Sequence, residues 1–123
     1  MSFLSLAALH PVEDGGLRLA NGTDTAGRLE VLHNGGWGTV CLDNFTDLEA
    51  SVACRQLGFA AGGVAPVLQY GAGRGSVWMD SVRCRGAEAR LADCRFDGWG
   101  WTDCSHFGEL GACRRKRAWG PPS

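Results

Sequence analysis

Six cysteines in a chain of 123 residues constrain its fold more than any other feature of the sequence. They are separated by 12, 29, 9, 9 and 8 residues, and no two form a Cys-x-x-Cys pair. An even number of cysteines at such gaps favours disulfides, and hence an oxidising compartment outside the cytosol. A structural zinc site needs thiolates in pairs two to four residues apart, which these gaps do not supply. Six free thiols in an intracellular protein are the other alternative, but a chain with 19 glycines is short of periodic structure and needs cross-links.

Length and composition indicate one domain, since 123 residues at 45% hydrophobic content can bury a single modest core. We expect the domain to cover residues 17–113. The apolar start, residues 1–16, lacks the charged beginning and the cleavage site of a secretory signal, and is interpreted as a linker or a vector-derived remnant. Residues 114–123 form a basic tail that ends in prolines. No apolar run approaches the roughly 20 residues needed to cross a bilayer, so a soluble domain is expected.

Charge is unevenly distributed. The run Arg114–Arg117, "RRKR", carries four positive charges, which leaves 8 basic and 13 acidic groups in residues 1–113. This body is therefore more acidic than the formal charge of −1 for the whole chain suggests. An acidic body argues against broad, nonspecific affinity for polyanions. The basic run itself has three interpretations: a heparin-like or nucleic-acid contact, a dibasic cleavage site, or an unstructured tail, of which we favour the tail.

Two local patterns predict secondary structure well. The segment "GRLEVLHNGGWGTVC" reads as two strands joined at Asn34-Gly35, a dipeptide that accepts the positive φ angles of a tight hairpin. A helix over about residues 47–57 follows, with Thr46 as N-cap, Glu49 completing a capping box and Gly58 as the stop. Its predicted apolar face consists of Leu48, Val52, Ala53 and Leu57.

The second half of the chain is less periodic. Residues 59–76 are rich in glycine and alanine and suggest irregular chain, and "SVWMDSV" reads as a strand with Val77 and Met79 on one side. A short second helix is predicted over about residues 87–93, and residues 96–111 read as loop. The expected fold class is therefore α+β, in a small disulfide-rich domain.

In this order, the segments "GRLEVLHNGGWGTVC", "ACRQLGF", "GSVWMDSVRCRGAEARLADC", "GWGWTDC" and the last cysteine resemble a scavenger receptor cysteine-rich domain, in its three-disulfide form. The resemblance covers about Leu17 to Cys113. It implies a curved antiparallel sheet of about five or six strands that cradles one main helix. The cysteines alone allow 15 pairings. The resemblance implies three of them: Cys41–Cys104, Cys54–Cys113 and Cys84–Cys94.

Domains of this family bind proteins, polyanions or microbial surfaces, and many hold a cation between clustered carboxylates. The positions that match the family's cation ligands are Asp43, Asp80 and Glu109, and calcium is the cofactor that the resemblance implies. The sequence departs from the family pattern at Leu42 and Ser81, and its last loop is one residue shorter. We therefore expect a weakened calcium site, with solvated acids near strand ends as the alternative.

Arginines form a second candidate site. Guanidinium groups bind sulfate, phosphate and carboxylate in two-point geometry, so a polyanion contact is expected if several of them face one way. The alternative is that each arginine pairs with a neighbouring acid. The candidates are Arg74, Arg83, Arg85, Arg90 and Arg95.

Two of the three asparagines lie in N-glycosylation triplets, at Asn21 and Asn44. A glycan on Asn44 would stand beside Asp43, on the surface that the family uses for ligands. Thr46 has a second role as helix cap, so its presence does not by itself establish glycosylation.

Catalysis finds little support, because His33 and His106 lack a recognisable nucleophile or acid at an informative spacing. The leading hypothesis is an extracellular ligand-recognition module of a larger secreted or membrane protein, which binds a protein or polyanionic ligand and no specific nucleic acid. The alternative is a disulfide-tied accessory module beside an enzymatic domain, such as a protease or an oxidase, with no ligand of its own.

Overall fold

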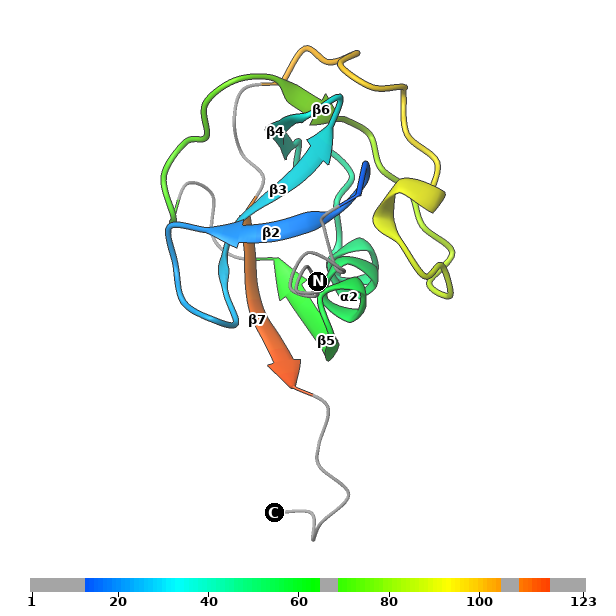
Figure 1. The fold of residues 1–123 in the computed structure, drawn as a ribbon. Coiled ribbons are helices and arrows are strands. Elements are labelled where there is room, and N and C mark those ends of the chain that lie inside the picture. Colours follow the sequence, from blue (N-terminus) through cyan, green and yellow to red (C-terminus); the bar gives the residue numbers. More distant parts are fainter. Residues whose placement is uncertain (1–12, 65–68, 105–108, 116–123) are drawn as a thin grey trace, which may run out of the picture.

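The computed structural model describes residues 13–64, 69–104 and 109–115, and of residues 109–112, 114 and 115 it describes the backbone only. Its elements follow the chain in a simple order (Figure 1). They are β2 (Leu17–Ala20), β3 (Gly27–His33), β4 (Gly36–Val40), α2 (Asp47–Gln56), β5 (Phe59–Val64), β6 (Val77–Met79), the 3-10 turn η1 (Leu91–Asp93) and β7 (Glu109–Arg115). One main helix and one sheet confirm the α+β fold class.

The sheet has the strand order β5-β7-β3-β4-β6, and β2, which lies off this path, pairs with β3. All pairs are antiparallel except β4 with β6, which run parallel. Parallel neighbours need a long crossover, and here helix α2 and strand β5 lie in the connection between them. The sheet is thus mixed rather than wholly antiparallel, which corrects the expectation at this one pair.

The hairpin between β3 and β4 is confirmed. Asn34 and Gly35 both have positive φ, at 55° and 80°, as a two-residue turn of this kind requires. The carboxylate of Asp14 accepts the N–H of Asn34 at 2.8 Å and fixes the turn from outside.

The capping box of α2 is also confirmed. The N–H of Thr46 donates to Glu49 Oε1 at 2.8 Å, and the Thr46 hydroxyl accepts the N–H of Leu48 at 3.2 Å. One predicted member of the apolar face is wrong, because Leu48 is 44% exposed. Its side chain lies against Gly86, where an added Cβ would come within 3.0 Å of Leu48 Cδ1. The buried face consists of Glu49, Ala50, Val52, Ala53 and Cys54.

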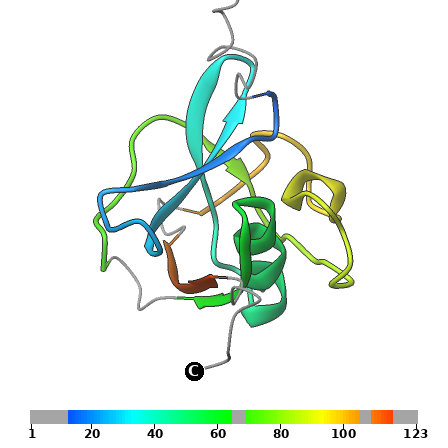
Figure 2. The ribbon, with the colours of Figure 1, turned by 60° about the horizontal axis from the view of Figure 1, so that its bottom comes forward.

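Two segments predicted as irregular are strands. Residues Phe59–Val64 form β5, and residues Glu109–Arg115 form β7, which also continues two residues past the predicted end of the domain. The two strands pair with each other, and α2 packs against β5 (Figures 1 and 2). The predicted second helix over 87–93 is limited to the single turn η1.

The core lies between α2 and the sheet, and its largest fully buried side chains include Leu29, Val31, Val40, Val52, Met79 and Leu91. Three disulfides join the same cysteines that the family resemblance implies. Cys54–Cys113 ties α2 to β7, and Cys41–Cys104 ties the end of β4 to the loop before β7. Cys84–Cys94 closes a loop with a sequence separation of 10.

Candidate functional site

Two arginines face each other across the loop that Cys84–Cys94 closes. Arg83 and Arg95 form an antiparallel bridge: the N–H of Arg83 donates to the carbonyl of Arg95 at 2.8 Å, and the reverse bond is 3.0 Å long. Residues paired in this way carry their side chains on the same face of the backbone pair. The backbone therefore starts the two arginine side chains side by side on one face.

An open hollow of about 620 Å³ lies on this face, which we call the arginine hollow. Arg83, Arg85 and Arg95 are all exposed, and these three arginines line the depression together with two acidic residues. Its lining is Arg83, Cys84, Arg85, Ala87, Glu88, Asp93 and Arg95.

None of these three guanidinium groups lies within 4.0 Å of a carboxylate of a described residue. The ion pairs found among described side chains involve other groups, namely Arg18–Glu30 and Arg28–Glu30, and Asp14 lies 3.0 Å from His33 Nδ1. Glu88, three residues after Arg85, instead accepts the N–H groups of Arg85 and Gly86, each at 2.8 Å. These bonds, first that from Arg85, hold the pKa of Glu88 below its ordinary value. Among the described side chains, these arginines therefore do not pair with neighbouring acids, which was the alternative for this site.

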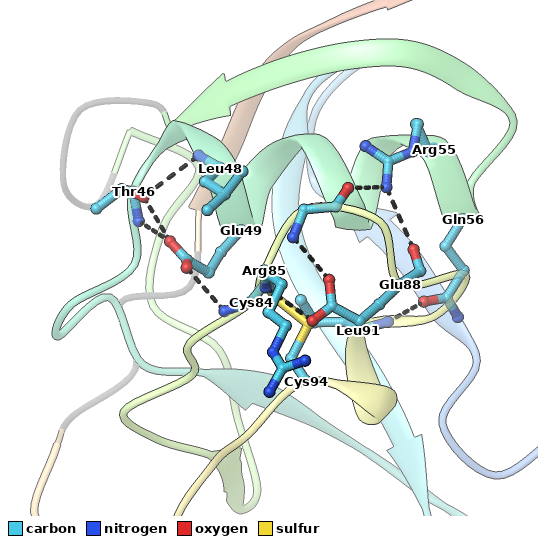
Figure 3. Close-up of a disulfide and its surroundings, with 11 residues drawn as sticks. Thr46, Leu48, Glu49, Arg55, Gln56, Cys84, Arg85, Glu88, Leu91 and Cys94 are labelled. Carbon is cyan, nitrogen blue, oxygen red and sulfur yellow. Dashed lines mark hydrogen bonds between the residues drawn. A yellow bond between two sulfur atoms is a disulfide. The ribbon is translucent and has the colours of Figure 1, made fainter.

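Helix α2 holds the arginine-bearing loop through two side chains two turns apart (Figure 3). Glu49 Oε2 accepts the N–H of Cys84 at 3.0 Å, and Gln56 Oε1 accepts the N–H of Leu91 at 2.7 Å. Residues seven apart lie on the same face of a helix, so one face of α2 grips both ends of the loop.

A third helix residue reinforces this grip. Arg55 Nη2 donates to the carbonyl oxygens of Gly86 and Glu88, at 2.6 and 3.2 Å. The arginine hollow is thus positioned by hydrogen bonds from a rigid element and by the Cys84–Cys94 disulfide.

Glu49 makes hydrogen bonds both to the start of α2 and to the loop. Burial raises its pKa, but hydrogen bonds from the Cys84 N–H and from the hydroxyl and N–H of Thr46 outweigh burial and hold the pKa below the ordinary value. The side chain therefore stays charged at neutral pH while it joins the start of α2 to the loop.

The structure brings together three of the five arginines predicted from the sequence. Arg90 turns away from the hollow, and its Nη2 donates to the carbonyl of Asp14 in the N-terminal turn. Arg74 is exposed but does not line the hollow. Of the basic run, Arg114 and Arg115 belong to β7, while Lys116 and Arg117 lie outside the described residues.

The predicted cation ligands have unequal surroundings. Asp43 is exposed, whereas Asp80 is only 3% exposed. Asp80 Oδ2 accepts the hydroxyl of Thr102 at 2.7 Å, and its backbone carbonyl accepts the N–H of Asp97 at 3.2 Å. Asp80 thus ties the end of β6 to the loop that carries Cys104.

An open hollow of about 450 Å³ beside Asp80 contains acids that the sequence analysis did not single out. Asp97 and Asp103 line it together with Thr102 and with Trp101, which is 73% exposed. The one sequence signal for them is the density of acids and tryptophans in "FDGWGWTDC", within the segment that reads as loop.

Neither close group of candidate ligand atoms among the described residues suits calcium. Two groups of three candidate ligand atoms lie within 4.8 Å of one another in this part of the chain: Cys41, Asp43 and Cys104, and Cys84, Glu88 and Cys94. Each contains a disulfide pair, and calcium prefers six to eight oxygen ligands. Glu109 begins β7, but its side chain lies outside the described residues, so the set Asp43, Asp80 and Glu109 stays a prediction.

Residues 20–113 match the family model of the scavenger receptor cysteine-rich domain. Two solved structures are similar. The crystal structure of the dimeric form of the SRCR domain of mouse MARCO is 41% identical with a TM-score of 0.64, and covers 76% of this chain and 88% of that one. The third SRCR domain of murine neurotrypsin is also 41% identical, with a TM-score of 0.65, and covers 76% of this chain and 90% of that one.

Similar curated proteins are much longer than this chain. Lysyl oxidase homolog 4 of Homo sapiens is 55% identical over 93 residues, which are 74% of this chain and 12% of that protein. Lysyl oxidase homolog 4 of Mus musculus is 50% identical over 108 residues, 85% of this chain and 14% of that protein. Lysyl oxidase homolog 2 of Gallus gallus is 50% identical over 93 residues, again 74% and 12%. The chain therefore spans about an eighth of the length of these relatives.

Proposed function

Because the chain belongs to the scavenger receptor cysteine-rich domain family, we propose that it is a non-catalytic recognition module of a larger extracellular protein and binds an anionic ligand at the arginine hollow. One observation carries this proposal. Arg83, Arg85 and Arg95 border a single open depression, and none has a carboxylate of a described residue within 4.0 Å.

The ligand class follows from the chemistry of the hollow. Guanidinium groups bind planar or tetrahedral oxyanions through two parallel hydrogen bonds, and adjacent guanidinium groups fit a chain of sulfate or carboxylate groups. Binding is expected to be local, because the rest of the body is acidic and repels a polyanion elsewhere. A sulfated glycan is the simplest ligand with these properties.

An extracellular location agrees with the covalent structure. Three disulfides and no free cysteine are typical of oxidising compartments. No helix in the described ranges has the length and hydropathy of a membrane span. Calcium at Asp43, Asp80 and Glu109 is not required for this mode of binding.

A second candidate function is favoured by the identity of the relatives. Domains 50–55% identical to this chain occur within lysyl oxidase homologs, where they make up 12–14% of the length. The chain would then be an accessory module that supports a neighbouring oxidase domain without a ligand of its own.

Titration of a size-defined heparin fragment into the folded domain separates the two functions. We expect saturable binding that weakens with salt, since ionic contacts at an exposed site are screened. Arg83→Gln or Arg95→Gln should weaken binding, while Arg74→Gln, an exposed arginine outside the hollow, serves as the matched control. Equal losses at all three positions, or no saturable binding, would contradict the proposal, and the second of these results would favour the accessory module.

A further inference from the structure

The two N-glycosylation triplets, at Asn21 and Asn44, have different surroundings in the folded domain. Both asparagines are exposed, and both have positive φ, at 59° and 63°. Asparagine tolerates this left-handed conformation better than most residues, so the turn geometry does not distinguish the two sites. The hydrogen bonding of their side-chain amides does distinguish them.

The amide of Asn21 is already engaged. Its Nδ2 donates to the backbone carbonyl of Tyr70 at 2.8 Å, across 49 residues of sequence. The backbone of Gly71 also approaches, since an added Cβ there would stand 3.5 Å from Asn21 Nδ2. A sugar on this nitrogen would replace one of its hydrogens and disturb a contact between two loops.

The amide of Asn44 has no hydrogen-bond partner among the residues that the structure describes. Asn44 lies in a tight turn that the N–H of Phe45 closes by donating to the carbonyl of Leu42 at 2.9 Å. Phe45 is 7% exposed and anchors the turn in the core, and Thr46 follows as the N-cap of α2. The turn therefore presents an exposed, unengaged amide from a firmly held backbone.

We propose that Asn44 is N-glycosylated and that Asn21 is not. The inference rests on the extracellular location in the proposed function. In the transfer, the Asn44 amide nitrogen loses one proton and forms a bond to the anomeric carbon of an oligosaccharide. The bond that breaks is that between this carbon and the diphosphate of a lipid-linked donor, and the lipid diphosphate leaves.

The capping box indicates when this transfer occurs. In the folded domain the Thr46 hydroxyl donates to Glu49 Oε1 at 2.5 Å and accepts the N–H of Leu48 at 3.2 Å. The hydroxyl that makes Asn44-Phe45-Thr46 an acceptor triplet is thus occupied once α2 has formed. Transfer therefore precedes the formation of the cap, and the contacts of the folded domain then decide which glycosylated chains can fold. A chain with a glycan on Asn44 still folds and carries it on an exposed turn, whereas a glycan on Asn21 opposes the contact with Tyr70, so such chains should be retained rather than secreted.

The glycan has a local consequence for the family's ligand edge. Asp43 is the neighbouring residue, and its backbone N–H lies 3.4 Å from Cys41 Sγ. A carboxylate oxygen of Asp43 also lies within 4.8 Å of the sulfurs of Cys41 and Cys104. A glycan on Asn44 covers this edge, withdraws Asp43 from ligand contact and restricts access of reductants to Cys41–Cys104.

The test uses the chain secreted from glycosylating cells. Peptide N-glycanase treatment in heavy-oxygen water marks each released site as a labelled aspartate, which mass spectrometry locates. We expect label at Asn44 in most molecules and little at Asn21. Asn44→Asp removes the acceptor but keeps a residue that tolerates positive φ, and should speed the reduction of Cys41–Cys104 measured by differential alkylation. Thr46→Ser keeps both the hydroxyl cap and the acceptor triplet, and should behave as wild type.

Each contrary result has a distinct meaning. Equal label at Asn21 and Asn44 overturns the selection between them, and unlabelled Asn44 in secreted, disulfide-bonded protein overturns the site itself. Either result leaves the arginine hollow intact if heparin still binds. Chain retained in the cytosol with free thiols would instead contradict the extracellular function and this inference together.

Discussion

The backbones of Arg83 and Arg95 hold each other in register, because each donates its N–H to the carbonyl of the other, at 2.8 and 3.0 Å. The positions of the two side chains therefore depend on main-chain bonds that most substitutions leave intact. This makes it practical to change the guanidinium groups without unfolding the loop that carries them.

A double-mutant cycle at Arg83 and Arg95 tests whether they contact one ligand. We expect each glutamine substitution to weaken heparin binding by roughly ten-fold, or about 1.4 kcal/mol. The two losses should not add, since residues in contact with a shared partner are typically coupled by about 0.5–3 kcal/mol. Titration calorimetry measures the cycle, with Arg83 and Arg74 as the control pair. Additive losses at Arg83 and Arg95 would mean that they act on separate groups.

Glu49 gives the stability of the domain a pH dependence of known sign. Its folded pKa lies below the ordinary value of 4.5, so its contribution is complete above about that pH and is lost as the pH falls through the folded pKa. Glu49→Gln places an amide donor against N–H donors, and should cost about 1–3 kcal/mol at pH 7.

Urea unfolding of wild type and Glu49→Gln at pH 7 and at pH 3 measures this contribution. The difference between the two proteins should narrow at the lower pH, because the wild-type carboxylate becomes protonated. The exposed Glu13→Gln serves as control and should change little at either pH. An equal difference at both pH values would show that the charge of Glu49 does not matter.

Local chemistry explains which parts of this fold are predictable from sequence. The capping box of Thr46 and Glu49 and the Asn34-Gly35 turn are encoded within a few residues, and both are confirmed. Strand β5, "FAAGGV", shows no alternation of apolar and polar residues that would predict a strand. It is extended because it pairs with β7, which begins 45 residues after β5 ends. Long-range pairing of a glycine-rich segment leaves no local signal.

The same distinction applies to the candidate site. The sequence placed five arginines close together, but only tertiary contacts decide which share a surface. Arg90 is removed from the set by the carbonyl of Asp14, 76 residues away. The second role of Glu49, as acceptor for Cys84, had no signal of its own, because the capping box already accounted for that residue.

Asp80 provides a test that separates a structural role from calcium binding. Asp80→Ala removes the buried acceptor for the hydroxyl of Thr102, and should lower the free energy of unfolding by about 1–3 kcal/mol. If the role is structural, thermal unfolding will show the same loss with calcium and with a chelator. Asp43→Ala, at an exposed position, should change stability by less than about 0.5 kcal/mol. A loss that appears only with calcium present would instead support the predicted cation set.

The disulfide that closes a short loop should cost less to remove than one that closes a long loop. Chain-entropy arguments give about 3 kcal/mol for Cys84–Cys94, with a sequence separation of 10, and about 4 kcal/mol for Cys54–Cys113, with a separation of 59. Cys84→Ala/Cys94→Ala should stay folded, because Glu49 and Gln56 still hold the loop, yet bind heparin more weakly as Arg83 and Arg95 loosen. Urea unfolding and heparin titration of both double variants check the order, and unchanged heparin binding would mean that the disulfide does not position the arginines.

Gly62, in strand β5, allows helix α2 and strand β7 to approach as closely as they do. A Cβ at this position would lie 2.0 Å from Cys54 Sγ and 3.2 Å from the Cα of Cys113, so Gly62→Ala must displace either β5 or the disulfide. Overpacking of this kind typically costs about 1–3 kcal/mol. Gly36→Ala is the matched control, because its nearest atom would be the carbonyl oxygen of His33 at 3.9 Å. Urea unfolding should separate the two variants clearly, and faster reduction of Cys54–Cys113 in Gly62→Ala should accompany the loss. If both alanine variants are equally stable, β5 does not pack against this disulfide as closely as the structure shows.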